Sequence, residues 1–193
     1  MWRCDRARRS LTRFALGLAI AGLAGCATVA PPPTPPTAVD GPRDWTGRFS
    51  VTLASDLPGG RQDAAAGRFT LLARPTAGGR VLELQLTSPF GQTLADARRA
   101  PDGASSLTLS DGRTLRGASL DAVIEQALGW PLPIDRLPDW LDDRFQTVLE
   151  RDARGEIALA ADSGWRIERE PRRWAFQRPH ADGRLRVVLV LDR

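Results

Sequence analysis

The sequence predicts a mainly β domain with few helices, built as one antiparallel sheet. Three observations lead to this fold class. Apolar and polar residues alternate over many short segments, turn-forming dipeptides separate these segments, and only one longer stretch has helical spacing. Because most links between the segments have hairpin length, neighbouring strands should run antiparallel.

Eleven segments have the pattern of strands. Phe49, Val51 and Leu53 alternate with polar residues, as do Leu82, Leu84 and Leu86, so each set should form the apolar face of a half-buried strand. Turn signals such as Asp111-Gly112 and Asp182-Gly183 divide the chain between strands. We expect strands at 48–54, 66–74, 80–87, 93–98, 105–110, 113–117, 146–152, 156–161, 164–170, 174–178 and 184–192.

One helix interrupts the strands after residue 117. Ser119 has the side chain of an N-cap, and Gly129 stands where a helix-ending glycine belongs. The apolar residues between them fall on one stripe, which should cover the sheet. A second, short helix is expected over 135–141, broken by Pro138.

The chain begins like an export precursor. Residues 1–13 hold five arginines and one acid, and an apolar run follows that is shorter than the roughly 20 residues of a membrane-spanning helix. We therefore expect a signal peptide over 1–25. Leu23-Ala24-Gly25-Cys26 matches the bacterial lipobox, so Cys26 should carry the lipid that anchors the mature protein.

A proline-rich stretch at 31–36 favours extended chain and cannot bury a core. We therefore expect a tether over 26–44 and one folded domain over 45–193. Five of the 27 basic residues, all arginines, and one of the 23 acids precede Cys26, so the mature chain is close to neutral. Its charge gives no argument for a nucleic-acid partner.

The sequence lacks the usual motifs of catalytic and metal sites. His180 is the only histidine, so a catalytic triad or a multi-histidine site has no second member, and we expect it in an exposed turn. We interpret Asp142 and Asp143 as a solvated edge rather than a catalytic pair. The expectation is a protein without enzymatic activity, cofactor or metal; an anchored hydrolase is the least favoured alternative.

The segment between the third and fourth expected strands is unusual. Pro89 and Gly91 should fix a tight turn with Phe90 at its tip. The residues alone leave two interpretations open. Either the ring folds back onto the core, or it projects to meet a membrane or acyl chains.

Several segments together resemble the outer-membrane lipoprotein receptor LolB family. The likeness covers nearly all of 45–193 and follows the lipobox. It rests on Trp45-Thr46-Gly47-Arg48-Phe49-Ser50-Val51, Ser88-Pro89-Phe90-Gly91, Leu128-Gly129-Trp130-Pro131-Leu132-Pro133, Leu137, Trp140-Leu141 and Gly164-Trp165. The chain departs from the family pattern after Leu141, at Leu71 and at its C-terminal end.

The resemblance implies an incomplete, strongly curved antiparallel β-barrel of eleven strands covered by helices. It also implies a monomeric outer-membrane receptor on the periplasmic face, which takes acylated lipoproteins from the periplasmic carrier LolA and inserts them among the outer-membrane lipids. The family's projecting apolar loop residue falls on Phe90, so Pro89, Phe90 and Gly91 become the expected membrane-insertion loop.

An acyl-binding cavity should lie between the apolar faces of the sheet and of the longer helix. Packing of the two faces as a plain core is the alternative, and some of their residues must do that. A structural lipoprotein that binds another envelope protein is the rival function. The expected cavity residues are Phe49, Val51, Phe69, Leu71, Leu82, Leu84, Leu86, Leu120, Val123, Ile124 and Leu128.

Overall fold

The computed structural model describes residues 41–55, 62–129 and 131–192. The expected signal peptide, Cys26 and most of the tether lie outside these residues, as does Trp130. Over the described part, one antiparallel sheet of eleven strands and two helices confirm the predicted fold class. The first strand begins at Arg43, two residues before the expected domain start.

The elements follow the predicted order, with strands that differ from the expected ranges mostly by one or two residues. The first two strands are longer than expected, because their polar ends continue the pairing beyond the apolar alternation. The strands are β1 (Arg43–Ala54), β2 (Gln62–Thr76), β3 (Gly79–Thr87), β4 (Thr93–Arg99), β5 (Ser105–Leu109), β6 (Thr114–Gly117), β7 (Thr147–Arg151), β8 (Ile157–Asp162), β9 (Trp165–Glu170), β10 (Arg173–His180) and β11 (Gly183–Leu191).

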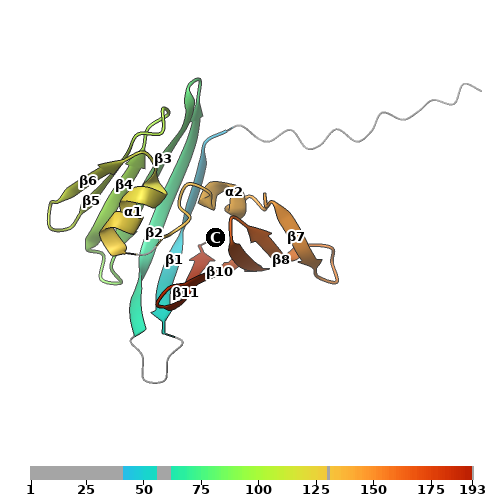
Figure 1. Ribbon diagram of the computed structural model, residues 1–193. Coiled ribbons are helices and arrows are strands. Elements are labelled where there is room, and N and C mark those ends of the chain that lie inside the picture. The colour runs from blue at the N-terminus through green and yellow to red at the C-terminus, as the bar shows by residue number, and fades with distance from the viewer. Residues whose placement is uncertain (1–40, 56–61, 130, 193) are drawn as a thin grey trace, which may run out of the picture. The chain divides into compact units, whose positions relative to one another are not determined.

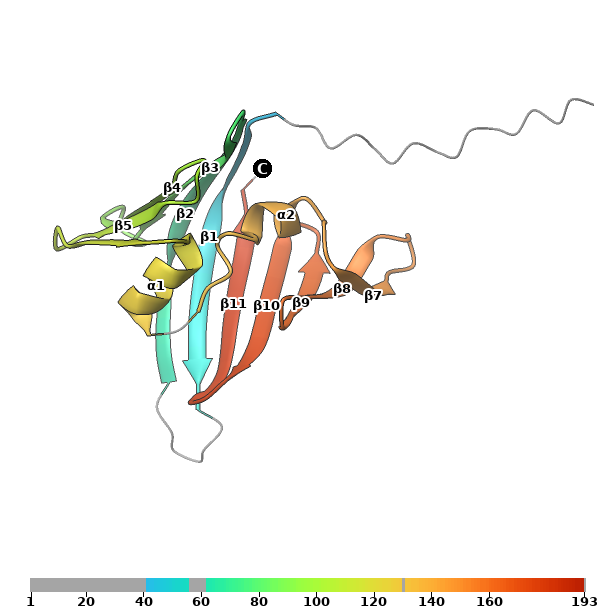
Figure 2. The same ribbon diagram turned by 45° about the horizontal axis from the view of Figure 1, so that its top comes forward.

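The sheet has the order β6-β5-β4-β3-β2-β1-β11-β10-β9-β8-β7. Every neighbouring pair is a hairpin except β1 and β11, which bring the two ends of the domain together with Phe49 opposite Leu189. The chain leaves one edge at β6 and returns at the other edge with β7. Both helices lie in this crossing, on the concave side of the strongly curved sheet (Figures 1 and 2). The result is an incomplete barrel.

Helix α1 (Leu120–Leu128) has the predicted ends. The Ser119 hydroxyl oxygen accepts a 3.1 Å hydrogen bond from the Ala122 backbone N–H, and Gly129 adopts the left-handed conformation with φ of 80°. Helix α2 (Leu137–Leu141) corrects the second helix prediction. It begins at Leu137, so Pro138 lies in its first turn and does not break it, because a proline there lacks only an N–H that has no partner in the helix.

The part of the concave face beneath α2 is a packed aromatic core. Trp140 of α2 stacks on Phe176 with ring centroids 5.4 Å apart and meets the edge of Trp165 at 6.4 Å. The buried Asp162 carboxylate beside it accepts hydrogen bonds from Arg136, Ser163 and the Gln146 backbone. Burial by itself raises the pKa of Asp162, but these donors outweigh it and the pKa lies below its ordinary value.

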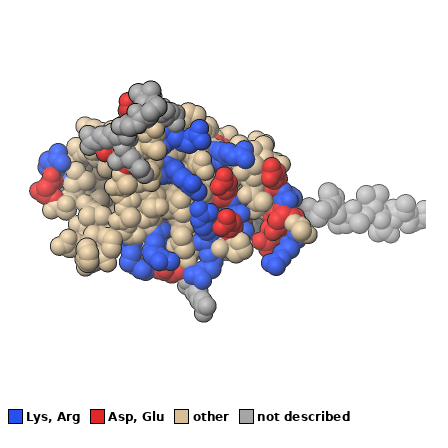
Figure 3. Space-filling model, turned by 90° about the horizontal axis from the view of Figure 1, so that it is seen from below, with Lys and Arg blue, Asp and Glu red and all other residues tan. Residues whose placement is uncertain are grey.

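One end of the sheet carries the β3–β4 turn (88–92) and the β10–β11 turn (181–182), and we call it the lower rim. It lies at the bottom in Figure 1. Seen from this end, arginines form a band that borders a broad uncharged area (Figure 3). The lower rim therefore combines positive charge with uncharged surface.

Candidate functional site: an apolar pocket and an exposed loop

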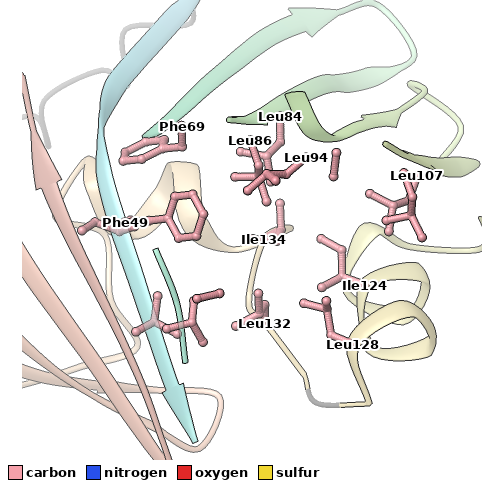
Figure 4. Close-up of a pocket in the computed structure, with 16 residues that line it drawn as sticks. Phe49, Phe69, Leu84, Leu86, Leu94, Leu107, Ile124, Leu128, Leu132 and Ile134 are labelled. Carbon is pink, nitrogen blue, oxygen red and sulfur yellow. The ribbon is translucent and has the colours of Figure 1, made fainter. Parts of the chain in front are cut away.

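A cavity of about 190 Å³ lies between the concave face of the sheet, α1 and the segment that follows α1. All sixteen lining residues are apolar, and Figure 4 shows them converging from the sheet on one side and from α1 and 132–134 on the other. Ala65 and Leu128 belong to the wall and are exposed, so the pocket opens toward the lower rim, where β2 begins. We call α1 together with 131–136 the lid.

Two phenylalanines on the sheet side of the pocket depend on glycines in the neighbouring strand. Phe49 lies opposite Gly67, and Phe69 lies opposite Gly47. A Cβ atom at Gly67 would stand 3.0 Å from the Phe49 ring and would clash with the Thr87 carbonyl oxygen. Only glycine therefore fits beside the ring without displacing it. This reciprocal pairing holds both rings against the pocket.

The structure places seven of the eleven expected cavity residues on the pocket wall. They are Phe49, Val51, Phe69, Leu84, Leu86, Ile124 and Leu128. The other four, Leu71, Leu82, Leu120 and Val123, are at most 1% exposed and lie in the packed core instead. Alternation shows which face of a strand a residue lies on, but not whether that part of the face borders the pocket or the packed core. The inner faces of β2 and β3 border the pocket near Phe69 and Leu86 and continue from there into the closed interior.

Nine wall residues were missing from the sequence prediction. The alternation in β4, β5 and β11 was visible and could have identified most of them, but the sequence did not show that these strands face the same cavity. Leu132 and Ile134 come from an extended segment without periodicity, so no pattern indicated them. The nine are Ala65, Leu94, Ala95, Leu107, Leu109, Leu132, Ile134, Val187 and Leu189.

The two parts of the lid are joined by a pair of aspartates. The Asp135 backbone N–H donates to the Asp121 carboxylate at 2.9 Å, and the Asp121 N–H donates to the Asp135 carboxylate at 3.3 Å. Arg99 of β4 lies 3.5 Å from Asp135. Burial raises the pKa of Asp121 to about 6, and the nearby Asp135 carboxylate adds to this effect, although the hydrogen bond from the Asp135 backbone opposes it.

The β3–β4 turn exposes Phe90 almost completely, at 92%. The Ser88 hydroxyl oxygen accepts hydrogen bonds from the backbone N–H groups of Phe90 and Gln92, and the Gly91 N–H donates to the Ser88 carbonyl oxygen. These bonds shape the turn without using the Phe90 ring. Of the two interpretations of Phe90, folding back onto the core is therefore wrong.

The polar residues considered as catalytic candidates have structural partners. His180 ends β10 and accepts a hydrogen bond from the Asp182 N–H; its side chain is only 17% exposed, which corrects the expected exposed position. Asp143 accepts a 2.6 Å hydrogen bond from Arg169, and Asp142 lies 3.3 Å from Arg144. In the ranges that the structure describes, no helix is long and apolar enough to cross a bilayer.

An open, curved antiparallel sheet that encloses an apolar pocket beneath helices defines the class of incomplete β-barrels with an internal hydrophobic cavity. Comparison with known proteins is more specific. A family model described as outer membrane lipoprotein LolB matches residues 44–181. The chain therefore belongs to the outer membrane lipoprotein LolB family, as the sequence motifs predicted.

Individual relatives support this membership. An outer-membrane lipoprotein LolB from Bordetella petrii is 37% identical, over 84% of this chain and 79% of its own. Proteins of the same name from Cupriavidus necator and Bordetella pertussis are 34% and 36% identical and match 97% and 95% of this chain, respectively. The protein is thus a lipid-anchored outer-membrane protein that acts in lipoprotein localisation, and it is not an enzyme.

Proposed function

We propose that the protein accepts acylated lipoproteins from the periplasmic carrier LolA in its apolar pocket and inserts them into the outer membrane. The observation that carries this proposal is the pocket wall, where every side chain is apolar. Each methylene group of an acyl chain exposed to water costs about 0.8 kcal/mol, and such a wall removes that cost.

Transfer needs no nucleotide or metal if the pocket binds the acyl chains more tightly than the carrier does. A difference of about 1.4 kcal/mol gives a tenfold bias toward the receptor. The Phe49 and Phe69 rings offer large apolar surfaces for this purpose, because the opposing glycines keep them at the pocket.

The lid must move to admit cargo. The cavity of about 190 Å³ is little larger than the roughly 150 Å³ cavity that holds one benzene molecule, so it accommodates only part of an acyl chain as it stands. Helix α1 packs on β4, β5 and β6 near one edge of the sheet, and α2 is fixed separately by its aromatic core. Displacement of α1 and 131–134 would enlarge the pocket while leaving that core intact.

Phe90 acts in the delivery step. Its ring lies outside the core, on a turn held by its own hydrogen bonds, and is free to enter the acyl region of a bilayer. The lipid on Cys26 anchors the chain, and the tether over 26–44 lets the domain reach both carrier and membrane.

A reconstituted transfer reaction tests the proposal. Purified mature protein is mixed with LolA that carries a fluorescently labelled lipoprotein, and the distribution of the label between the two is followed by pull-down of LolA. Passage of label to the receptor without nucleotide is expected. Retention of all label on LolA, with no entry of a fluorescent fatty acid into the pocket, would instead favour the rival function of a protein-binding envelope lipoprotein.

A further inference from the structure

Three exposed arginines lie on the convex face of the sheet near the lower rim, one on β9 and two on β11. Arg184 and Arg186 lie on β11, two residues apart and therefore on the same face. Arg166 of β9 pairs with Gln177 of β10, which pairs with Arg186, so the two arginines are separated by one strand. We call Arg166, Arg184 and Arg186 the basic patch.

The guanidinium groups of the basic patch are not held in ion pairs. In the described part of the chain, none of its three arginines forms an ion pair with a carboxylate, whereas Arg68, Arg169 and others in the same sheet do. Glu168, Asp182 and Asp63 lie at this end of the sheet, and Asp182 faces His180. Arg184 and Arg186 share one face of β11, so their like charges repel, and an external anion would offset this repulsion.

The basic patch shares the lower rim with exposed apolar groups. Phe90 is 92% exposed in the β3–β4 turn, and Leu128 at the pocket opening is 43% exposed. In the antiparallel register, Arg186 lies opposite Thr52 and Arg184 opposite Ala54, nearer this end than the level of Thr87, where β3 enters its turn. Basic and apolar side chains together are typical of surfaces that lie at a bilayer interface.

We propose that Arg166, Arg184 and Arg186 bind the phosphate groups of anionic phospholipids and thereby hold the lower rim, with the pocket opening and Phe90, against the membrane. This deepens the proposed delivery step and rests on it, because it gives the orientation in which cargo leaves the pocket. The observations favour lipid over the carrier protein, since an isolated exposed ring suits a fluid acyl layer better than a fixed protein surface.

A spin label at the β10–β11 turn tests the orientation in the intact, lipid-anchored protein. Ala181→Cys carries the nitroxide, and the protein is placed in vesicles of phosphatidylcholine alone or mixed with phosphatidylglycerol. Collision with membrane-dissolved oxygen and with a water-soluble nickel chelate reports contact with the bilayer. We expect contact in the anionic vesicles only, and its loss in about 1 M salt, where the Debye length falls to roughly 3 Å.

The decisive variant is Arg166→Gln, Arg184→Gln and Arg186→Gln together. Each basic residue near an anionic surface contributes about fivefold to binding, so the triple variant should weaken membrane contact by about a hundredfold. Arg74→Gln, Arg116→Gln and Arg154→Gln remove the same charge elsewhere in the domain and should leave contact intact. Arg178 is kept, because its guanidinium lies over the Trp165 ring at 5.4 Å.

Fatty-acid uptake by the triple variant separates this proposal from the proposed function. Normal uptake with lost bilayer contact supports a lipid-binding patch. Unchanged contact in the triple variant would overturn the proposal, and slower transfer from loaded LolA with unchanged contact would assign the patch to the carrier instead. Loss of uptake in the unmodified protein would count against the proposed function itself.

Discussion

At the scale of single residues, the pocket depends on two glycines in the neighbouring strands as well as on the side chains of its wall. Gly67 and Gly47 supply flat backbone on which Phe49 and Phe69 lie. Both phenylalanines were among the expected cavity residues, but the glycines opposite them were not predicted, because the pairing of β1 with β2 has no signature in either strand alone.

Gly67→Ala should therefore disturb the fold and the pocket together. The new methyl group would meet the Thr87 carbonyl oxygen and the Phe49 ring, and overpacking of this kind costs about 1–3 kcal/mol. Urea denaturation should show this loss, and a fluorescent fatty acid should bind more weakly. Gly78→Ala is the control, since its nearest atom would be the Pro101 Cβ at 3.7 Å. Equal effects of the two changes would contradict the prediction.

Leu84 tests the pocket wall directly. Leu84→Glu puts a carboxyl group without a partner among apolar side chains, where it must stay protonated or admit water. Fatty-acid binding at neutral pH should fall at least about tenfold. A buried carboxyl group without a hydrogen-bond partner costs more than about 1.4 kcal/mol, which corresponds to a tenfold change in affinity. Val81→Glu, on the outer face opposite Arg74, should bind normally. A similar loss in both variants would show that the inner face of β3 is not the binding surface.

At the scale of elements, the lid combines a well-defined helix with a linkage that titrates. Ser119 and Gly129 set the limits of α1, and both were recognisable in the sequence because capping chemistry is local. The contact between Asp121 and Asp135 was not recognisable, since it depends on how the chain returns after α1. The break expected at Pro138 was wrong for a different reason, because a proline is unfavourable inside a helix but not in its first turn.

The Asp121 linkage gives the lid a defined pH dependence. Its pKa is raised to about 6 from the ordinary 3.8, so the folded state holds the proton more tightly than the unfolded chain does. This contribution to stability is complete below pH about 4 and is lost as the pH rises through about 6. Asp121→Asn keeps an oxygen that can accept the Asp135 N–H and should remove this part of the slope.

Thermal melts of both proteins between pH about 4 and about 7 measure the difference. The variant should gain on the parent protein as the pH rises and should be the more stable of the two at neutral pH. A constant difference across the whole range would mean that Asp121 does not titrate in this window. At each pH the two proteins are measured in the same buffer, so the contributions of the other carboxyl groups to stability cancel in the difference.

At the scale of the whole molecule, the fold was more predictable than the pocket. Each strand is bounded by its own turn signal, and hairpins join strands that are neighbours in sequence, so eleven strands and an antiparallel sheet follow from local patterns. The β1–β11 pairing and the curvature are long-range properties. They decide that Leu86 reaches the pocket while Leu82 is buried in the core, and no periodicity encodes that difference.

The anchor belongs to this scale, since it determines where the domain acts. Cys26→Ala should abolish lipid attachment, because we propose that the Cys26 thiol accepts the diacylglycerol group. Metabolic labelling with palmitate measures the result, and the variant should lose its label and leave the outer-membrane fraction. Two or more acyl chains give stable anchoring where a single chain is marginal. Label that persists in the variant would place the lipid elsewhere.

If Phe90 acts in delivery alone, as we propose, a substitution at this position should separate delivery from uptake. Its ring contributes nothing to the core, and burial of a phenylalanine in the acyl region yields about 1.5–3 kcal/mol, which aids local insertion without anchoring the domain. Phe90→Glu should therefore leave the melting temperature and uptake from LolA nearly unchanged while it slows release into liposomes. Phe90→Leu should behave like the parent protein, because the step requires only an apolar tip.

The two transfer steps and a thermal melt, measured on the same preparations, distinguish the possible roles of this turn. Slower release with normal uptake assigns Phe90 to the membrane step. Equal slowing of both steps at an unchanged melting temperature would place Phe90 in the contact with LolA, and normal release by Phe90→Glu would exclude an insertion role. Because the Phe90 side chain is almost completely exposed, a change in either rate at an unchanged melting temperature reports on function rather than on folding.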